Sequence, residues 1–450
     1  MNVESRCPVT GQIVFSAVAV TTNDIDAALT LACGAWPSWA AAAVEDRAEV
    51  LRSFANLIDE NVERLASLIS REVGKRVSDA RGEVEWTALS ARWYADHPPQ
   101  DEKVDGVEVL RVPLGVIATV TPWNVPLITP AWKWLPALMA GNSVVWKPSE
   151  LATGIAVEAA SLLELAGLPR GLMQVLPGGA DVARIICGDS RVSGVHFTGS
   201  THAGRAINEL VAPRFARAAL EMGGVNAALV FQDADLTEAA DAIVASGTAL
   251  AGQKCTSIRR VLVHREVADE LTRELRSRLR RLLVGAPDRK GIDVGPMISP
   301  SARRRADASV SAAECRGGTV LASATLSPEA VSEAFFRPVL IGGLPPGDAL
   351  TMEEVFAPIL TLEVFNEDPD VWQMANASGY GLAGAIYTRD ATRIADARRK
   401  LTVGVLSVNG RSDAVGLQQP FGGRGLSGNG RPEGGHYVYS AVTDLVAVYQ

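Results

Sequence analysis

The chain has 450 residues, more than a single hydrophobic core usually serves, so we expect two or three domains. Hydrophobic residues make up 47% and charged residues 21%, as in ordinary globular proteins, and the formal net charge is −8. This acidic balance argues against a nucleic-acid-binding surface, which would need a basic stripe.

The first hundred residues have mainly helical patterns. We predict helices over 23–41, 44–73 and 78–95. In the second of these, apolar residues recur at helical spacing from Val50 to Ile69, and the pattern ends near Gly74. Residues 96–114 begin with His-Pro-Pro and then alternate charged with apolar residues, which is typical of a linker that runs into an exposed β-ribbon.

From residue 115 short β-branched segments alternate with helical ones. Strands are predicted at 115–120, 143–147, 172–176, 192–197 and 218–222, with helices at 151–166, 180–187 and 202–212. This alternation indicates βαβ units and a parallel sheet. A second α/β series begins at 226–231, after a Gly-Gly pair, and runs to about 420. The tail 437–449 has the pattern of one strand.

The cysteines and histidines are scattered. The five cysteines form no CxxC pair and the five histidines no i,i+4 pair, so neither a disulfide framework nor a metal site is predicted. The N-terminus lacks the apolar core of a signal peptide, and no run of about 18 apolar residues is present. We therefore expect a cytoplasmic protein with no membrane or nucleic-acid partner.

The stretch FTGSTHAGRA (197–206) follows a predicted strand and opens a helix. Gly199 and Gly204 allow close backbone approach, Ser200 can cap the helix, and a helix N-terminus favours a phosphate. A P-loop would need a lysine where Arg205 stands and a serine or threonine where Ala206 stands, which argues against an NTPase or a kinase. A turn that only packs remains the alternative.

Three further segments place polar residues just after predicted strands, where open α/β sheets bind ligands. VVWKPSE (144–150) carries Lys147, Ser149 and Glu150, which fit either ribose recognition or a simple helix start. In LEMGG (220–224), Glu221 is a candidate general base, and in TPWN (121–124), Asn124 is a candidate oxyanion donor or a turn former.

The sequence AGQKCTSIRR (251–260) places Cys255 among polar residues. Seven short motifs occur in the order TPWN, KPSE, FTGSTxxG, LEMGG, GQKC, EEVFAP and QPFGG, and together they resemble the aldehyde dehydrogenase superfamily over nearly the whole chain. The motifs are nearest to those of the semialdehyde dehydrogenase branches. Glu221 and Cys255 are 34 residues apart, as the family keeps its base and nucleophile.

The resemblance implies catalytic roles. Cys255 is then the nucleophile, and Glu221 is the base that activates the water for deacylation. Asn124 and the backbone N–H of Cys255 form the oxyanion hole, and Lys133 matches a lysine that the family keeps behind the asparagine. A thiolate is the softest and most easily ionised nucleophile among side chains, and about 10²–10³ in rate comes from each oxyanion donor.

The resemblance also implies a nicotinamide cofactor. NAD is favoured over NADP, because Glu150 would repel a 2′-phosphate. Lys147 and Glu150 match the adenosine-ribose contacts, and Ser200 matches the pyrophosphate contact. Glu354 and Phe356 match the residues that hold the nicotinamide ribose and ring. The expected set is completed by Trp123, Ser149, Gly199, Gly204 and Gly223.

The substrate is expected near residues 125–134, 254–260 and 407–421. An arginine could clamp the carboxylate of a semialdehyde, whereas the tryptophans, Trp134 among them, could line an apolar or aromatic pocket. The expected contacts are Val125, Trp132, Lys254, Thr256, Arg259, Arg411 and Phe421. Acidic, aliphatic and aromatic aldehydes stay open as substrates.

The family pattern is interrupted in one place that bears on the chemistry. Many members carry a proton-relay glutamate after SGNGR, whereas Pro432 stands there in this chain and Glu433 follows one place late. A CoA-acylating enzyme is disfavoured because Glu221 is present. A dinucleotide-binding protein without turnover is disfavoured because Cys255, Glu221 and Asn124 occur together.

The implied fold is α/β. It has a Rossmann-type parallel-sheet cofactor domain, a second α/β catalytic domain and a small β oligomerisation element. We assign residues 1–97 and 115–222 to the NAD-binding domain and 223–425 to the catalytic domain. Residues 98–114 and 437–450 form the oligomerisation ribbon, and the resemblance implies a homodimer or homotetramer.

Overall fold

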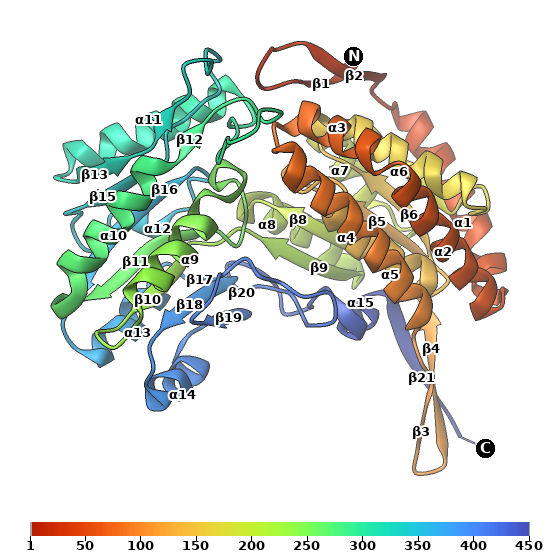
Figure 1. Ribbon diagram of the computed structural model, residues 1–450. Coiled ribbons are helices and arrows are strands. Elements are labelled where there is room, and N and C mark those ends of the chain that lie inside the picture. The colour runs from red at the N-terminus through yellow and green to blue at the C-terminus, as the bar shows by residue number, and fades with distance from the viewer. Residues whose placement is uncertain (1, 450) are drawn as a thin grey trace.

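The computed structural model describes residues 2–449, so the ends of the predicted ranges at Met1 and Gln450 lie outside the described residues. Two sheets form the centres of two lobes, and a thin ribbon projects from one of them together with the C-terminal strand (Figure 1). The first sheet belongs to the N-terminal half of the chain and the second to the C-terminal half.

The chain begins with an antiparallel pair of strands followed by four helices that cover the first lobe (Figure 1). Thr21 and Asp24 form a capping box at the start of the first helix. The elements are β1 Asn2–Arg6, β2 Ile13–Val18, α1 Thr22–Ala41, α2 Val44–Glu60, α3 Val62–Val73 and α4 Val77–Asp96.

The single helix predicted over 44–73 is wrong, because the structure has two helices that meet at Asn61. Asn61 has φ −113° and ψ 15°, and its side-chain amide donates to the carbonyl of Leu57 at 2.8 Å. Asparagine competes with the helix for backbone partners in this way. The apolar periodicity continues across the break, so it does not reveal it.

The sheet of the first lobe has the order β7-β6-β5-β8-β9, and all its strand pairs are parallel. Its central strand β5 is buried along its whole length, as expected for a sheet covered on both faces. The alternation of strands and helices therefore predicted this sheet correctly. The elements are β5 Val116–Val120, α5 Ile128–Met139, β6 Ser143–Lys147, α6 Thr153–Leu165, β7 Met173–Val175, α7 Ala180–Gly188, β8 Val192–Gly199, α8 Thr201–Val211 and β9 Arg217–Met222.

The sheet of the second lobe has the order β13-β15-β16-β11-β10-β18-β19 and is parallel except for the edge pair β13–β15. This is the second α/β series that the sequence predicted. The elements are β10 Asn226–Val230, α9 Leu236–Thr248, β11 Ile258–His264, α10 Ala268–Arg281, β12 Leu283–Val284, α11 Pro300–Cys315, β13 Thr319–Ser323, β14 Thr325–Leu326, β15 Val339–Gly342, α12 Ala349–Met352, β16 Ile359–Phe365, α13 Asp368–Asn376, β17 Tyr380–Gly381, β18 Ala383–Tyr387, α14 Ala391–Lys400, β19 Val405–Val408 and β20 Arg424–Gly425.

The ribbon consists of β3 Glu102–Val104 and β4 Val107–Pro113, and the C-terminal strand β21 Thr443–Val448 adds to β4 (Figure 1). The prediction that 437–449 is one strand is wrong in its first part, where a 3₁₀ turn Gly435–Val438 and a short helix α15 Tyr439–Val442 precede β21. Tyr439 is buried there and donates its hydroxyl to the carbonyl of His97 at 2.8 Å. Tertiary burial has overridden the strand propensity of this segment.

Over residues 2–449 no single helix is long and apolar enough to cross a membrane. Helices α1 and α2 reach the necessary length and apolar composition only when they are taken together, and the chain bends by 115° between them.

Candidate active site

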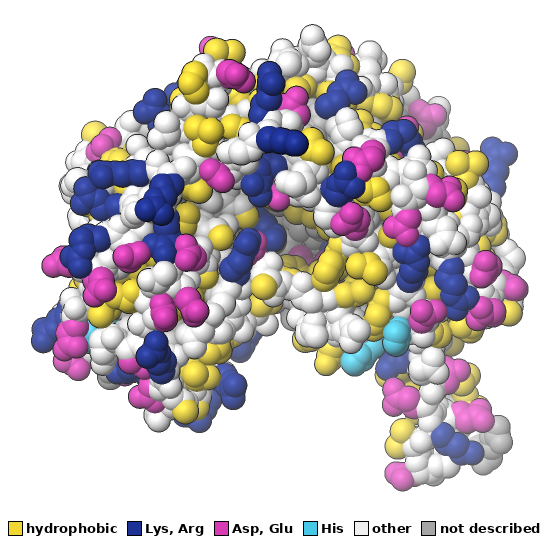
Figure 2. Space-filling view, viewed as in Figure 1, with side chains coloured by type: hydrophobic (Ala, Val, Ile, Leu, Met, Phe, Trp, Pro, Cys, Tyr) yellow, Lys and Arg dark blue, Asp and Glu magenta, His cyan; other side chains and the backbone are white. Residues whose placement is uncertain are grey.

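A cavity of about 540 Å³ lies between the two lobes, and Cys255 is part of its wall. The space-filling view shows a deep hollow at the junction of the lobes (Figure 2). Both lobes and the loops after β19 contribute to the wall. It is lined by Trp86, Pro122, Trp123, Asn124, Val125, Ile128, Thr129, Trp132, Thr198, Gly199, Ser200, Met222, Gly223, Lys254, Cys255, Thr256, Glu354, Phe356, Asp413, Val415, Phe421 and Glu433.

Cys255 stands on an irregular loop between α9 and β11. Leu250 and Ala251 have φ of 51° and 53°, a left-handed conformation that costs non-glycine residues energy. Gly252 has φ +67°, and a Cβ there would meet the backbone of Pro358 at 2.4 Å. The loop turns this sharply because the neighbouring chain leaves no room for a wider path.

Side chains from two neighbouring strands, β10 and β11, fix this loop. The amide of Asn226 donates to the carbonyl of Cys255 at 2.7 Å and to that of Ser257 at 2.8 Å. Arg259 donates to the carbonyls of Gly252 and Ala357. The loop that carries Cys255 is therefore tied to β10 and to the loop before β16.

The surroundings of Cys255 oppose ionisation of its thiol. Burial, the charge of Glu354 and the more distant charge of Glu221 raise the pKa of Cys255 to about 12, although the ammonium of Lys254 acts in the opposite direction. At neutral pH the thiol is then protonated. A nucleophilic attack needs a nearby group that takes this proton.

Asn124 follows β5 and lies on the cavity wall. Its amide nitrogen donates to the carbonyl of Gln253 at 2.9 Å, which leaves its second N–H for another acceptor. Gln253 is itself fixed, because its side chain accepts from the N–H of Ile298 at 2.8 Å and donates to the carbonyl of Leu250 at 3.0 Å. Asn124 is therefore held rigidly by Gln253, which lies two residues before Cys255 in the sequence.

Glu221 ends β9 and is buried, but it is not part of the cavity wall. One carboxylate oxygen accepts from the N–H of Gly423 at 2.9 Å, and the other has no hydrogen-bond partner within residues 2–449. Burial and the charge of Glu433 raise the pKa of Glu221 well above its usual range. A carboxylate with a raised pKa is suited to accept a proton near neutral pH.

Lys133 and Glu433 form a buried ion pair beside Glu221. Lys133 is fully buried on α5, whereas Glu433 lies on the cavity wall. Glu433 therefore reaches the site, although it follows one place late in the sequence. The backbone of Glu433 pairs with that of Phe421, at 2.7 and 2.6 Å, and this pairing fixes its position.

The expected cofactor residues fall into two groups. Trp123, Gly199, Ser200, Gly223, Glu354 and Phe356 line the cavity. Lys147, Ser149, Glu150 and Gly204 do not, although the register of the strands brings Lys147, Val120 and Phe197 to the same end of the sheet.

Several of these residues have structural roles. Ser200 caps α8 through the N–H of Ala203 at 3.3 Å, and Ser149 caps the turn after β6 through the N–H of Leu151 at 3.3 Å. Gly204 allows close packing, since a Cβ there would meet the sulfur of Met222 at 2.4 Å. The simple structural interpretation therefore suffices for Ser149 and Gly204.

The cavity wall nevertheless fits a dinucleotide. The hydroxyl of Thr198 is buried and has no hydrogen-bond partner among residues 2–449, and it lies just before the N-terminus of α8. Gly223 gives the Glu354 carboxylate room on the cavity wall, because a side chain at this position would clash with it. A Cβ on residue 223 would lie only 1.8 Å from the carboxylate. Such a strand end, glycine pair and helix N-terminus suit a phosphate-bearing ligand.

Five of the seven expected substrate residues line the cavity: Val125, Trp132, Lys254, Thr256 and Phe421. The ring of Trp132 meets that of Phe421 edge to face at 6.0 Å, and its N–H donates to the hydroxyl of Ser90 at 3.1 Å. Trp86 on α4 lies outside the ranges expected from the sequence, and no local motif indicates it. Asp413 and Val415 fall within the expected range 407–421, although the sequence did not single them out.

Three expectations about the substrate pocket need correction. Arg259 is buried in backbone contacts and cannot reach a substrate in the cavity. Arg411 is not on the cavity wall, because its guanidinium pairs with Asp413 at 2.8 and 2.9 Å. Trp134 faces the core, where it packs edge to face with Phe54 at 5.5 Å.

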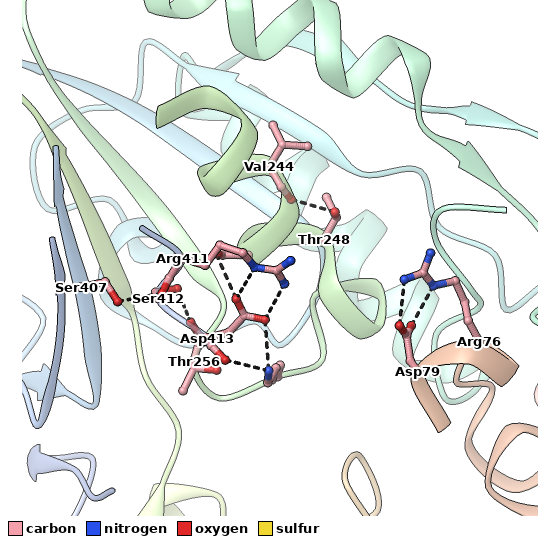
Figure 3. Close-up of polar contacts among 11 residues, drawn as sticks. Arg76, Asp79, Val244, Thr248, Thr256, Ser407, Arg411, Ser412 and Asp413 are labelled. Atoms are coloured by element: carbon pink, nitrogen blue, oxygen red, sulfur yellow. Dashed lines mark hydrogen bonds and ion pairs between the residues drawn. The ribbon is translucent and has the colours of Figure 1, made fainter. Parts of the chain in front are cut away.

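Asp413, on the cavity wall, joins two cations. It pairs with Arg411 and also accepts from the ammonium of Lys254 at 3.1 Å. Burial opposes its ionisation, but the hydrogen bonds from Arg411 and the charge of Lys254 lower the pKa of Asp413 to about 2. Figure 3 shows Arg411 against Asp413, with the separate pair of Arg76 and Asp79 at the right of the view. The three linked groups carry a net charge of +1.

Comparison with known proteins places this site in a family. The aldehyde dehydrogenase family model matches residues 1–448. The chain is 36% identical over 437 residues to a non-phosphorylating aspartate-semialdehyde dehydrogenase of Halomonas elongata, covering 95% of this chain and 88% of the relative. It is 33% identical over 429 residues to a succinate-semialdehyde dehydrogenase of Paenarthrobacter nicotinovorans, covering 93% and 94%.

A solved structure agrees. Betaine aldehyde dehydrogenase from Staphylococcus aureus in complex with NAD⁺ superimposes with a TM-score of 0.95 at 28% identity, covering 99% of this chain and 91% of that chain. The expected fold and family are thereby confirmed. The chain belongs to the aldehyde dehydrogenase family, whose members oxidise aldehydes with NAD or NADP as the electron acceptor.

Proposed function

We propose that this enzyme oxidises a small semialdehyde, an aldehyde with a carboxylate at its far end, to the corresponding dicarboxylic acid. The observation that carries the proposal is the position of Lys254, next to Cys255 on the wall of the same cavity. The two residues are adjacent in sequence and line one cavity, which suits a substrate of a few carbons. The wall has no other lysine or arginine among the described residues.

The first step needs a nucleophile, a proton acceptor and an oxyanion site. The sulfur of Cys255 bonds to the aldehyde carbon while its proton passes to a carboxylate, for which Glu221 is suited by its raised pKa. The carbonyl oxygen becomes an oxyanion. The free N–H of Asn124 and the backbone N–H of Cys255 are the donors proposed to stabilise it.

The second half of the reaction is hydride loss and hydrolysis. NAD, when bound, supplies the acceptor for the hydride that leaves the substrate carbon. Before hydrolysis Glu221 loses the proton that it took from Cys255, and the neighbouring ion pair of Lys133 and Glu433 is proposed to carry this proton away. The carboxylate of Glu221 then removes a proton from the attacking water, and the carbon–sulfur bond breaks to release the acid. The departing thiolate takes that proton from Glu221, which restores the thiol.

The residues proposed for NAD lie along the carboxyl end of the first sheet. Lys147 is buried and donates to Glu150 at 3.2 Å, so both groups can meet the hydroxyls of a ribose. Glu150 would repel a 2′-phosphate, which supports NAD over NADP. Ser200 and the start of α8 would meet the pyrophosphate, and Glu354 and Phe356 the nicotinamide end.

The net positive group of Lys254, Asp413 and Arg411 supports an acidic substrate electrostatically. The unpartnered hydroxyl of Thr256, which is also on the wall, offers a further donor. A specific observation favours a second candidate, an aromatic aldehyde, because Trp86, Trp132 and Phe421 line the same cavity. The two candidates make opposite predictions for substrate choice.

We also propose the division of the chain that the sequence indicated. Residues 1–97 and 115–222 bind the cofactor, 223–425 carry the nucleophile, and the ribbon with β21 joins copies into a homodimer or homotetramer. The solvent-exposed apolar residues Leu445 and Val446 on β21 support the last point. The cytoplasmic location stays a prediction.

A panel of steady-state assays tests the proposal. The purified enzyme is given NAD⁺ or NADP⁺ with succinate semialdehyde, butanal and benzaldehyde, and formation of the reduced cofactor is followed by absorbance. We expect the highest kcat/KM with succinate semialdehyde and NAD⁺, without added CoA. A preference for benzaldehyde would overturn the acidic substrate in favour of the aromatic candidate. A requirement for CoA would overturn the hydrolytic step.

A further inference from the structure

Glu83, on α4, makes contacts outside the cavity that bear on Asn124. One of its carboxylate oxygens accepts from the backbone N–H groups of Leu127 and Ile128, at 2.8 and 3.2 Å. The other forms a buried ion pair with Lys75. Both side chains are 3% exposed, so their charges depend on each other and on these hydrogen bonds.

The two N–H groups belong to the start of α5, which has no side-chain cap of its own. The first N–H groups of a helix have no partners within it, and a carboxylate there is favoured by the helix dipole. Glu83 thus serves as the cap for α5 from another helix. Its position fixes where α5 begins.

The position of Asn124 depends on where the backbone of α5 begins. Asn124 is three residues before Leu127, on the turn that joins β5 to α5. Its amide is held on the other side by the carbonyl of Gln253. The side chain that faces the cavity is therefore anchored by Gln253 at its tip and by Glu83 through the backbone behind it.

We propose that Glu83, held by Lys75, is a positioning residue for the oxyanion donor Asn124. This inference rests on the proposed function, in which Asn124 stabilises the oxyanion. Glu83 does not line the cavity and touches no reacting atom. Its effect on the reaction passes through the position of the turn, and small displacements of a catalytic group are costly.

A double-mutant comparison tests this. Glu83→Gln keeps an oxygen for the two N–H groups but removes the charge that Lys75 pairs with. We expect kcat to fall about tenfold with little change in KM for NAD⁺. In an Asn124→Ala background the same change should lower kcat by less than about twofold, because the group that it positions is already absent.

Glu72→Gln is the matched control. Glu72 is also a buried glutamate that caps a later helix, through the N–H groups of Gly154 and Ile155 at 2.8 and 2.9 Å, but that helix, α6, contributes nothing to the cavity wall. We expect it to lower the melting temperature without lowering kcat. A general effect of losing a buried helix cap would instead reduce kcat in both variants.

The outcomes separate the two proposals. If Asn124→Ala leaves kcat unchanged, the oxyanion role fails, and this inference fails with it. If Asn124→Ala lowers kcat by about 10²-fold or more but Glu83→Gln lowers it equally in both backgrounds, only the positioning role is overturned. Should Glu83→Gln not fold, Glu83→Asp keeps the charge but is one methylene shorter, and the same pattern is expected of it.

Discussion

The two lobes build their shares of the active site in different ways. The first lobe places Ser200 and Glu221 at the ends of strands in a regular parallel sheet, and Asn124 on the turn that follows β5. The second lobe places Cys255 and Phe356 on irregular loops. Among the described non-glycine residues with positive φ, Leu250, Ala251 and Phe356 all belong to these loops, with φ from 51° to 56°.

This difference shows where the site stores strain. Left-handed backbone at a non-glycine residue persists only where the surrounding structure enforces it. Here the enforcing contacts are those of Asn226 and Arg259 with the loop carbonyls. The regular lobe holds Glu221 and Asn124, the proposed proton acceptor and oxyanion donor, and the strained lobe holds Cys255, the proposed nucleophile. Four predictions test this contrast.

Replacing Cys255 by alanine should have the largest effect. We expect kcat for aldehyde oxidation to fall by about 10⁴-fold or more, since no other described group on the cavity wall is a thiol. Cys315→Ala, at an exposed position outside the cavity, is the control and should retain full activity. Residual activity above a few per cent in Cys255→Ala would show that the nucleophile is elsewhere.

The ionisation of Cys255 should follow its raised pKa. Below a pKa of about 12 the thiolate fraction rises about tenfold for each pH unit, so alkylation by iodoacetamide in cofactor-free enzyme should accelerate about a hundredfold from pH 7 to pH 9. Mass spectrometry of the Cys255 peptide measures the rate. Because the charge of Glu354 raises this pKa, Glu354→Gln should react faster at pH 8. A plateau near pH 8 would mean that the thiolate is already formed.

The charge of Lys254 should matter only for acidic substrates. Lys254→Met is expected to lower kcat/KM for succinate semialdehyde about tenfold, or about 1.4 kcal/mol in transition-state binding, and to leave the value for butanal nearly unchanged. Lys290→Met, at an exposed site away from the cavity, is the control. An equal loss with both aldehydes would assign Lys254 to the nucleophile loop and not to the substrate.

The smallest effect is expected from relief of backbone strain. Ala251→Gly removes only a methyl group and permits φ of 53° without penalty, so we expect stability to rise by about 1 kcal/mol. Thermal unfolding measures this. Phe215→Gly is the comparison in the first lobe, since Phe215 has φ of 54° and a fully exposed side chain outside the site. A lower melting temperature for Ala251→Gly would mean that the loop is not strained.

The sequence predicted the regular parts of the fold because their determinants are local. Buried β-branched segments and helical periodicity located the strands from 115 to 222 and their order along the chain. It failed at Asn61, where one side chain competes for a backbone carbonyl inside a continuous apolar pattern. It failed again at Tyr439, where a distant partner, His97, favours a helical turn in a segment of strand-forming residues.

For the site, the sequence by itself determined which residue types are available for chemistry. The motifs around Asn124, Glu221 and Cys255 are short and local, and their resemblance to one family was enough to name the reaction. The spacing of these residues along the chain did not indicate which groups their side chains would face. Only the tertiary structure decided that Arg259 faces backbone carbonyls, that Arg411 is held by Asp413, and that Glu433 reaches Lys133.

The physical reason is that a side chain's partner depends on contacts between segments far apart in sequence. Lys133 and Glu433 are 300 residues apart, and Glu83 caps a helix that begins 45 residues later. Burial decides these pairings, because a buried charge or N–H group must find a partner wherever the packing of the lobes provides one. Composition and motif supply the candidates, and the packing of the two lobes selects among them.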